Sequence, residues 1–98
     1  METFSDLINS DKPVFVDFYA DWCGPCKAMD PVLKEVSGLA KDKARFIKIN
    51  IDKNEKAARK YNVQAVPTFM IFRHGAIVWR HSGMISNADL LAALSQNT

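Results

Sequence analysis

The hydrophobic and polar positions divide the chain into alternating strand-like and helix-like segments. An almost continuous apolar run at 13–20 is typical of a strand buried on both faces, and the run at 45–51 predicts a second strand. Apolar residues at helical spacing predict a helix from Pro25 to about Lys41, kinked at Pro31 by the proline ring. Its apolar stripe is ordinary core and comprises Met29, Val32, Leu33, Val36, Leu39 and Ala40.

Capping signals predict one helix at each end of the chain. Thr3 followed three positions later by Asp6 resembles a capping box, so we expect a short first helix that ends before Pro13. Ser86 with Asp89 repeats the signal and predicts a closing helix. Both terminal segments are therefore expected to be helical.

The middle of the chain supplies the rest of the sheet. A short polar-faced helix is predicted at 54–61, and β-rich segments at 67–73 and 76–82 flank His74-Gly75. Because glycine tolerates a positive φ, this junction predicts a tight turn between antiparallel strands. The expected order is αβαβαββα. Strands that alternate with helices imply a parallel pair, so the fold class is α/β, with a mixed central sheet of about four strands and helices on both faces.

Length and composition restrict what such a fold can do. Ninety-eight residues, 48% of them hydrophobic, fit a single domain over 1–98 with its own core. The first twelve residues lack the apolar core of a signal peptide, and no window approaches the roughly 18 apolar residues of a membrane span. The thirteen basic and eleven acidic residues are interleaved, which disfavours nucleic-acid binding. We expect a soluble, cytoplasmic protein with no membrane or nucleic-acid partner.

The only two cysteines, Cys23 and Cys26, are separated by Gly24-Pro25. Structural disulfides persist mainly in secreted proteins. A bridge across so short a loop also removes little chain entropy, about 2 kcal/mol compared with about 3 kcal/mol for a fifteen-residue loop. The pair is therefore a poor structural staple.

The position of the pair favours redox chemistry. Cys23 follows the buried strand, and Pro25 suits the first turn of a helix, so Cys23 is expected at a helix N-terminus. Unpaired N–H groups and the positive end of the helix dipole stabilise a thiolate there and lower the thiol pKa from about 8.5. A thiolate attacks disulfides, and Cys26, one turn further along, can attack the resulting mixed disulfide. Cys23 is the expected nucleophile and Cys26 the expected resolving thiol.

Two other interpretations of the cysteine pair stay open at this point. A zinc ion takes about four ligands, but the remaining candidates, His74 and His81, both fall in the predicted hairpin and are not spaced as a second pair. We therefore expect no metal site. The cysteines could also pack as small hydrophobic residues without reacting.

Sequence blocks around and beyond the cysteines resemble the thioredoxin family over nearly the whole chain. They are VDFYADWCGPCK, Pro31, KINID at 48–52, VPT at 66–68, FRHG at 72–75 and SG at 82–83. The resemblance implies the family's fold and its thiol–disulfide oxidoreductase activity, which reduces protein disulfides in electron transport and cell redox homeostasis. Gly24 and Pro25 are similar to the redox-tuning pair of the reducing branch, whereas disulfide isomerases usually carry Gly-His.

The resemblance also implies the source of electrons and the partners. No cofactor is expected to be bound, because electrons would come indirectly from NADPH through a flavoprotein, thioredoxin reductase. The other expected partners are client proteins that contain disulfides. The protein itself is expected to be a monomer.

Asp17 is an anomaly within its strand, because an ionised carboxylate buried on both faces is costly and should have a raised pKa. It could be a hydrogen-bonded core residue, or an edge residue that faces water. The resemblance implies a third role, a proton acceptor that helps to deprotonate Cys26. Lys48 matches the family's lysine near that aspartate and joins the candidate catalytic residues, although a solvated strand lysine fits the pattern equally well.

A substrate-binding rim is implied in the same way. Val66-Pro67 could be an ordinary strand start, but the family has a cis-proline here that faces the cysteines. The residue before it offers backbone hydrogen bonds to an extended substrate. Trp22 could also be core filler, although the position before Cys23 lies on an exposed turn. The expected rim is Trp22, Ala65, Val66, Pro67, Gly83 and Met84, whereas Phe69 and Trp79 are assigned to the core.

One departure from the family pattern concerns the sheet. The family usually has a strand before the first helix, and this chain begins too late to supply it. Residues 45–51 are therefore expected to form a sheet edge, protected by Lys43, Arg45 and Lys48.

Other departures surround the cysteines. Tyr19 stands where many relatives have Trp, and Ala65 where many have Gly. Asp30 precedes Pro31, where a small neutral residue is common, and we expect its charge to raise the pKa of the Cys26 thiol slightly. None of these departures removes a catalytic group.

Three functions are carried forward. The leading hypothesis is a cytoplasmic protein-disulfide reductase. The alternative is a binding subunit that holds a partner protein by the same apolar rim. A thiol oxidase or isomerase is the third, and it requires a markedly more oxidising reduction potential.

Overall fold

The computed structural model describes residues 3–98. Within these residues, four α-helices and four strands follow one another in the predicted order, αβαβαββα. The elements are α1 (Phe4–Ile8), β1 (Val14–Tyr19), α2 (Gly24–Ala40), β2 (Arg45–Asn50), α3 (Glu55–Lys60), β3 (Thr68–Arg73), β4 (Ala76–Ser82) and α4 (Asn87–Gln96). A 3₁₀ turn at Lys41–Lys43, which the sequence pattern did not indicate, connects α2 to β2.

The four strands form one mixed sheet in the order β2-β1-β3-β4. β1 pairs with β2 in parallel and with β3 in antiparallel orientation, and β3 pairs with β4 in antiparallel orientation. The predicted mixed sheet is therefore confirmed, and β2 is an edge strand as expected. β1 is hydrogen-bonded on both sides, and five of its six residues are buried. It forms the centre of the fold.

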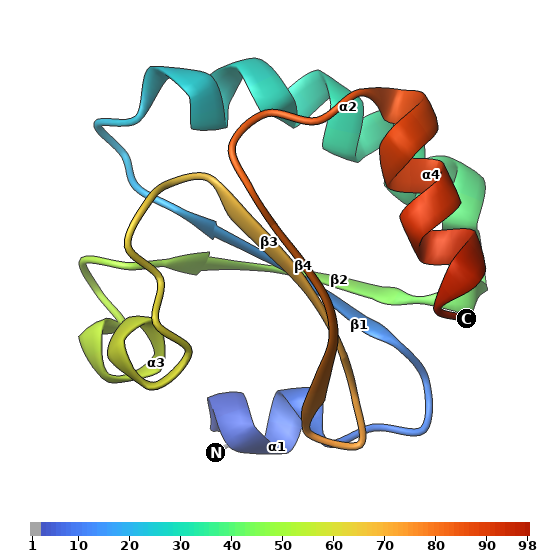
Figure 1. The fold of residues 1–98 in the computed structure, drawn as a ribbon, viewed down its shortest axis with the longest axis horizontal. Helices are drawn as coiled ribbons and strands as arrows, with labels where there is room; N and C mark the ends of the chain where they lie inside the picture. The colour runs from blue at the N-terminus through green and yellow to red at the C-terminus, as the bar shows by residue number, and fades with distance from the viewer. Residues whose placement is uncertain (1–2) are drawn as a thin grey trace.

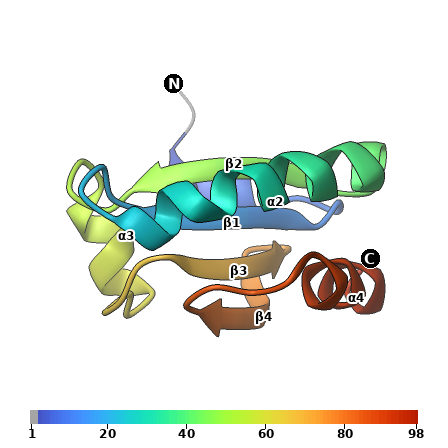
Figure 2. The same ribbon diagram turned by 90° about the horizontal axis from the view of Figure 1, so that it is seen from above.

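Helices cover both faces of the sheet. α2 and α4 lie together on one face, and α1 and α3 lie on the other (Figure 1). Figure 2 shows the same arrangement from above, with α2 running along β1 and β2. Because side chains alternate along a strand, β1 contributes to two cores: Phe15 faces α2 and α4, whereas Val14, Val16 and Phe18 face α1 and α3. Phe69 is a member of the first core and Trp79 packs against it, which confirms both assignments.

The predicted helix caps are present. The Thr3 hydroxyl accepts the backbone N–H of Asp6, and the Asp6 carboxylate accepts the backbone N–H of Thr3, which completes a capping box. The Ser86 hydroxyl accepts the N–H of Asp89 at the start of α4. Pro31 lies within α2, which continues through it to Ala40.

The hairpin between β3 and β4 turns at the predicted pair. His74 and Gly75 both have positive φ, 52° and 81°, which glycine adopts at little cost. Their backbone N–H groups donate to the carbonyls of Ser10 and Ile8 and thus attach the hairpin to the end of α1. No helix within residues 3–98 is long and apolar enough to cross a membrane.

Candidate active site

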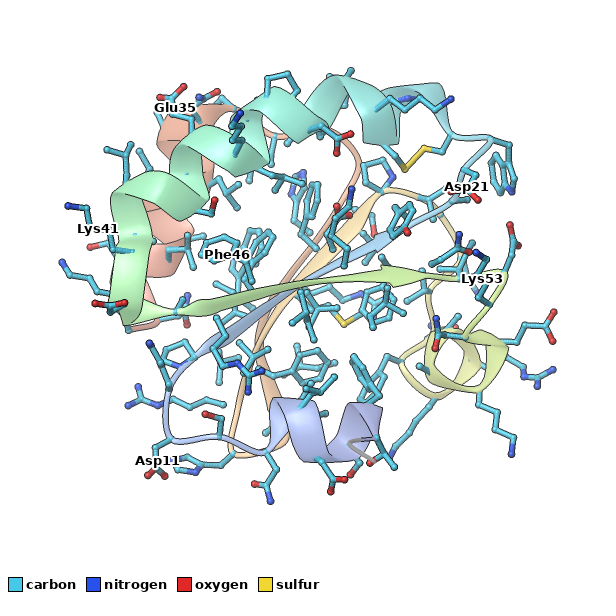
Figure 3. The ribbon with its side chains drawn as sticks, turned by 180° about the vertical axis from the view of Figure 1, so that it is seen from behind. Asp11, Asp21, Glu35, Lys41, Phe46 and Lys53 are labelled. Carbon is cyan, nitrogen blue, oxygen red and sulfur yellow. A yellow bond between two sulfur atoms is a disulfide. The ribbon has the colours of Figure 1, made fainter. Side chains whose placement is uncertain are left out.

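Cys23 and Cys26 form a disulfide at the N-terminal end of α2. The bond is drawn in yellow in Figure 3, near the labelled Asp21. Both cysteines are almost fully buried, and they pack with Ala20 in a small cluster below the loop that follows β1. The disulfide closes a loop too short to stabilise the fold much, so its position at a helix end points to chemistry.

Cys23 is the N-cap residue of α2. Its backbone is extended, with φ −91° and ψ 107°, and its Sγ accepts the backbone N–H of Cys26 at 3.1 Å. Pro25 occupies the first turn, where its missing N–H leaves no unpaired donor. The predicted placement of Cys23 at a helix N-terminus is confirmed. A thiolate formed at this sulfur would be stabilised by the same N–H group and by the helix dipole.

Asp17 is a buried carboxyl group without a full set of partners. It lies in the central strand, and within residues 3–98 its Oδ1 is the one buried side-chain nitrogen or oxygen that lacks a hydrogen-bond partner. Burial raises the pKa of Asp17 from 3.8 to about 6, an effect that the charge of Lys48 opposes and that of Asp30 reinforces. The interpretation of Asp17 as a water-facing edge residue is therefore wrong.

Lys48 does not donate to Asp17, although the two are paired in the register of β1 and β2. Its Nζ instead donates to Asp30 Oδ1 at 3.2 Å, and it lies 4.6 Å from the centre of the Tyr19 ring. Half of each charged side chain of this ion pair is exposed. From the sequence, we predicted only that Asp30 raises the pKa of the Cys26 thiol. The contact with Lys48 was missed, because residues 18 positions apart in different elements carry no local signal of contact.

The loops around the disulfide bring the predicted rim together. Val66-Pro67 is a cis peptide bond, as expected, and the Pro67 carbonyl accepts the N–H of Gly83 at 2.8 Å. Trp22 and Met84 are large apolar side chains exposed to 69% and 57%, so the interpretation of Trp22 as core filler is wrong. Of the remaining rim residues, Ala65 is exposed, Val66 and Gly83 are half-buried, and Pro67 is buried.

Trp22 is fixed from the other side by the loop after β2. Its indole Nε1 donates to Asp52 Oδ2 at 2.9 Å, a contact that sequence reasoning did not indicate. Asp52 is itself placed by Asn50, whose side-chain oxygen accepts the N–H of Asp52 at 2.9 Å. The exposed indole thus has a defined orientation beside Cys23.

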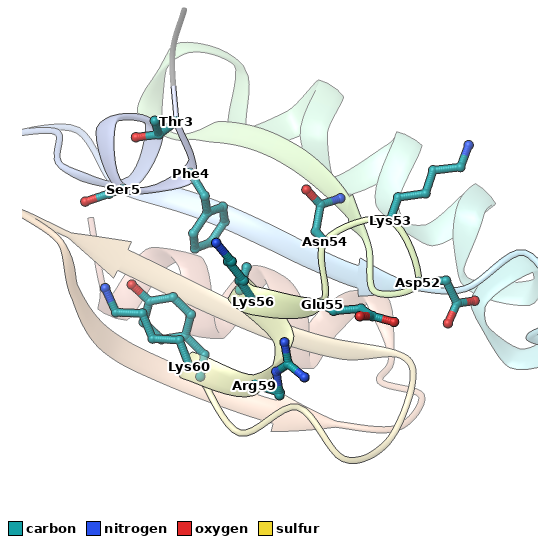
Figure 4. A pocket seen from close by; sticks show the side chains of 12 residues that line it. Thr3, Phe4, Ser5, Asp52, Lys53, Asn54, Glu55, Lys56, Arg59 and Lys60 are labelled. Carbon is teal, nitrogen blue, oxygen red and sulfur yellow. The ribbon is translucent and has the colours of Figure 1, made fainter.

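A cavity of about 670 Å³ lies between α1 and α3, and no cysteine lines it. Figure 4 shows Phe4 of α1 on one wall and Lys60 of α3 on the other. Its lining carries two acidic side chains, Asp52 and Glu55, and four basic ones, and it includes no cysteine or histidine. Within residues 3–98, no group of three or more Cys, His, Asp and Glu side chains is arranged to hold a metal ion.

The fold and the CxxC disulfide at a helix N-terminus define the class of thioredoxin-fold proteins with a CxxC pair. The Thioredoxin family model matches residues 1–96, and the chain belongs to the thioredoxin family.

Known proteins of this family are similar to the chain over most of its length. It is 43% identical over 97 residues to Thioredoxin Y1, chloroplastic, of Arabidopsis thaliana, covering 98% of this chain and 56% of that protein. It is 41% identical over 92 residues to the Thioredoxin of Pseudomonas aeruginosa, covering 94% of this chain and 85% of that protein. The chain thus spans little more than half the length of the plant relative and most of the bacterial one.

Solved structures show the same likeness. The thioredoxin of Malassezia sympodialis superposes with a TM-score of 0.88 at 36% identity, covering 95% of this chain and 81% of that one. Mitochondrial Thioredoxin 3 of Saccharomyces cerevisiae, in its oxidised form, superposes with a TM-score of 0.86 at 31% identity, covering 95% and 86%. These neighbours support the predicted fold class.

Proposed function

We propose that the protein reduces disulfides of client proteins by reversible dithiol–disulfide exchange. The observation that carries this proposal is the cysteine at the N-cap of α2, whose Sγ accepts the N–H of Cys26 and bonds to the Cys26 sulfur. In the reduced protein, Cys23 is the nucleophile because the helix N-terminus stabilises its thiolate. Cys26, buried one turn further along, resolves the mixed disulfide.

The proposed reaction has two exchange steps. The Cys23 thiolate attacks one sulfur of the client disulfide, forms a bond to it, and releases the other client sulfur as a thiolate. Cys26 then loses its proton to Asp17 and attacks Cys23. The Cys23–Cys26 bond forms while the bond from Cys23 to the client breaks, and the second client sulfur leaves as a thiolate. Two electrons pass to the client, and both cysteines are oxidised.

The proposed client-binding surface is the rim of Trp22, Ala65, Val66, Pro67, Gly83 and Met84. Its support is the exposure of two large apolar side chains, Trp22 directly before Cys23 and Met84 directly after Gly83. The hydrogen bond from Gly83 to the Pro67 carbonyl brings two of the rim loops together. An extended client segment could pair with the backbone before Pro67, as in strand addition.

An insulin-reduction assay tests the proposed function. With a small dithiol as electron donor, the wild-type chain should accelerate disulfide reduction, whereas Cys23→Ser should be inactive. Cys26→Ser should attack clients but accumulate as a mixed disulfide. If the wild-type chain leaves the uncatalysed rate unchanged, or both variants trap clients equally, the assignment is wrong. Binding without catalysis would instead identify a binding subunit.

The reduction potential separates a reductase from an oxidase. Thioredoxin is itself the reference protein for a value near −270 mV, which we expect for this chain by its family membership. Equilibration with glutathione mixtures of known ratio measures it. A value above about −200 mV would identify an oxidant or isomerase.

We further propose that electrons reach the disulfide from NADPH through a flavoprotein thioredoxin reductase, and that the protein acts in the cytoplasm. The support is that both cysteines of the sequence belong to the redox pair, which is typical of a reducing compartment. NADPH oxidation coupled to the oxidised chain and a purified thioredoxin reductase tests the electron source. Fractionation of native cells with a specific antibody tests the location, and recovery outside the cytoplasm would refute it.

A further inference from the structure

Lys48 contacts both Asp30 and Tyr19, two residues at which this chain departs from the family pattern. Lys48 of β2 carries its Nζ 3.2 Å from Asp30 Oδ1 of α2 and 4.6 Å from the ring centre of Tyr19, at the end of β1. Exposed pairs of this kind contribute little to the stability of a fold. The main effect of the contact is therefore to decide where the positive charge of Lys48 lies.

That charge lies at a boundary between two cavities. One, of about 360 Å³, is lined by Asp17 together with apolar residues such as Phe15 and Phe46. The other, of about 290 Å³, is lined by Cys26. Asp30 and Lys48 line both cavities, and no other residue does. The ion pair thus lies at the junction between the space beside the buried carboxyl and the space beside the resolving cysteine.

We propose that Asp30 is a positioning residue that holds the Lys48 ammonium at this boundary, away from the Asp17 carboxylate, and so keeps Asp17 free to accept the proton of Cys26. The inference rests on the proposed function and adds a residue to it. Without Asp30, the Lys48 ammonium would be free to turn toward the unpartnered Oδ1 of its register neighbour.

The charges around Asp17 fix the direction of the effect. Burial is the main cause that raises the pKa of Asp17 to about 6; Lys48 lowers it and Asp30 raises it. A Lys48 ammonium that moved closer would stabilise the carboxylate and make it a weaker base. The charged groups that face the carboxyl cavity are Lys48 from β2, and Asp30 and Lys34 from α2. The neighbouring cavity adds Asp21 and Lys27, while β3 contributes Phe69 as the register partner.

The affected step is resolution of the mixed disulfide. Asp17 takes the proton from the Cys26 thiol, the Cys26 sulfur bonds to Cys23, and the client sulfur leaves with the electron pair of the broken bond. The Asp17 proton then passes to solvent. A weaker base takes this proton less readily, so removal of Asp30 should slow resolution while the attack by Cys23 proceeds as before.

Stopped-flow kinetics with a chromogenic aromatic disulfide separate the two steps, because each releases one coloured thiolate and only the first depends on probe concentration. In Asp30→Asn, the midpoint of the pH profile for the second step should fall by half a pH unit or more, about a threefold change in the ionisation constant. Asp30→Glu keeps the charge and should restore the profile. Asp42→Asn removes the same charge from an exposed position beyond α2 and should leave it unmoved.

A double variant distinguishes positioning from simple repulsion between Asp30 and Asp17. In a Lys48→Gln background no ammonium remains to be positioned, so Asp30→Asn should produce a clearly smaller shift than it does in the wild type. An equal shift in both backgrounds would overturn the inference, as would a profile of Asp30→Asn that superposes on the wild type. If the wild type itself shows no second release of thiolate, the mixed disulfide is not resolved, and the proposed function is contradicted instead.

Discussion

Replacement of Asp17 by asparagine should stabilise the oxidised protein at neutral pH and have little effect in acid. The carboxyl is 3% exposed, and its pKa rises from 3.8 to about 6 on folding. The unfolded chain therefore releases this proton at lower pH than the folded one. The contribution of the Asp17 carboxyl to the free energy of unfolding is therefore fully present below about pH 4. It decreases as the pH rises through about 6, and at higher pH it no longer changes.

The size of the effect follows from the same two values. They differ by about 2 pH units, and about 1.4 kcal/mol per unit gives a loss of about 3 kcal/mol in the free energy of unfolding between acid and pH 8. In Asp17→Asn this loss should disappear. The asparagine amide has its own hydrogen-bonding and packing effects, but these are the same at both pH values and cancel in the comparison.

Urea denaturation of the oxidised wild type and variant at pH 4 and pH 8 measures both differences. The disulfide keeps the cysteines from titrating during the experiment. Asp42→Asn is the matched control, because its exposed side chain undergoes the same chemical change at the surface. If Asp17→Asn gains no more stability relative to the wild type at pH 8 than at pH 4, the buried carboxylate does not carry the cost assigned to it.

Further predictions concern the edge strand, the core and one helix cap. Amide hydrogen exchange in β2, 45–50, should be faster than in β1, 14–19, since one side of β2 has no neighbouring strand in the described structure; equal protection would indicate a covering partner. Leu90→Ala should cost about 2–5 kcal/mol in urea melts. Leu39→Ala should cost far less, because the structure exposes Leu39 on the surface of α2, and its assignment to the core from its spacing is wrong. Ser86→Ala removes the N-cap of α4 and should cost about 1 kcal/mol, while an unchanged melt would show that the cap is dispensable.

The fold could be predicted because its signals are local. The apolar run of β1, the capping residues Thr3 and Ser86, and the His74-Gly75 turn each determine a short segment independently of the rest of the chain. Every strand end lies within one residue of its predicted position. The 3₁₀ turn after α2 was missed, because a short polar segment with Lys41 and Lys43 has no distinguishing period.

The candidate site was predictable only in part. The cysteine pair and its helix N-terminus follow from adjacent residues, and the burial of Asp17 follows from its apolar neighbours in the strand. The contacts of Lys48 with Asp30 and Tyr19 depend instead on how three elements pack and on the conformation of a long side chain. No spacing along the chain encodes such a contact, so it required the structure.

The central position of β1 determines how heat should inactivate the protein. Asp17 is fixed to a strand whose backbone is hydrogen-bonded on both sides, so its carboxyl cannot leave the site unless the sheet itself opens. The two cysteines of the proposed exchange, by contrast, lie just beyond the end of that strand and in the first turn of α2. Activity should accordingly persist only while the sheet is folded, so no form in which the sheet has melted should remain active.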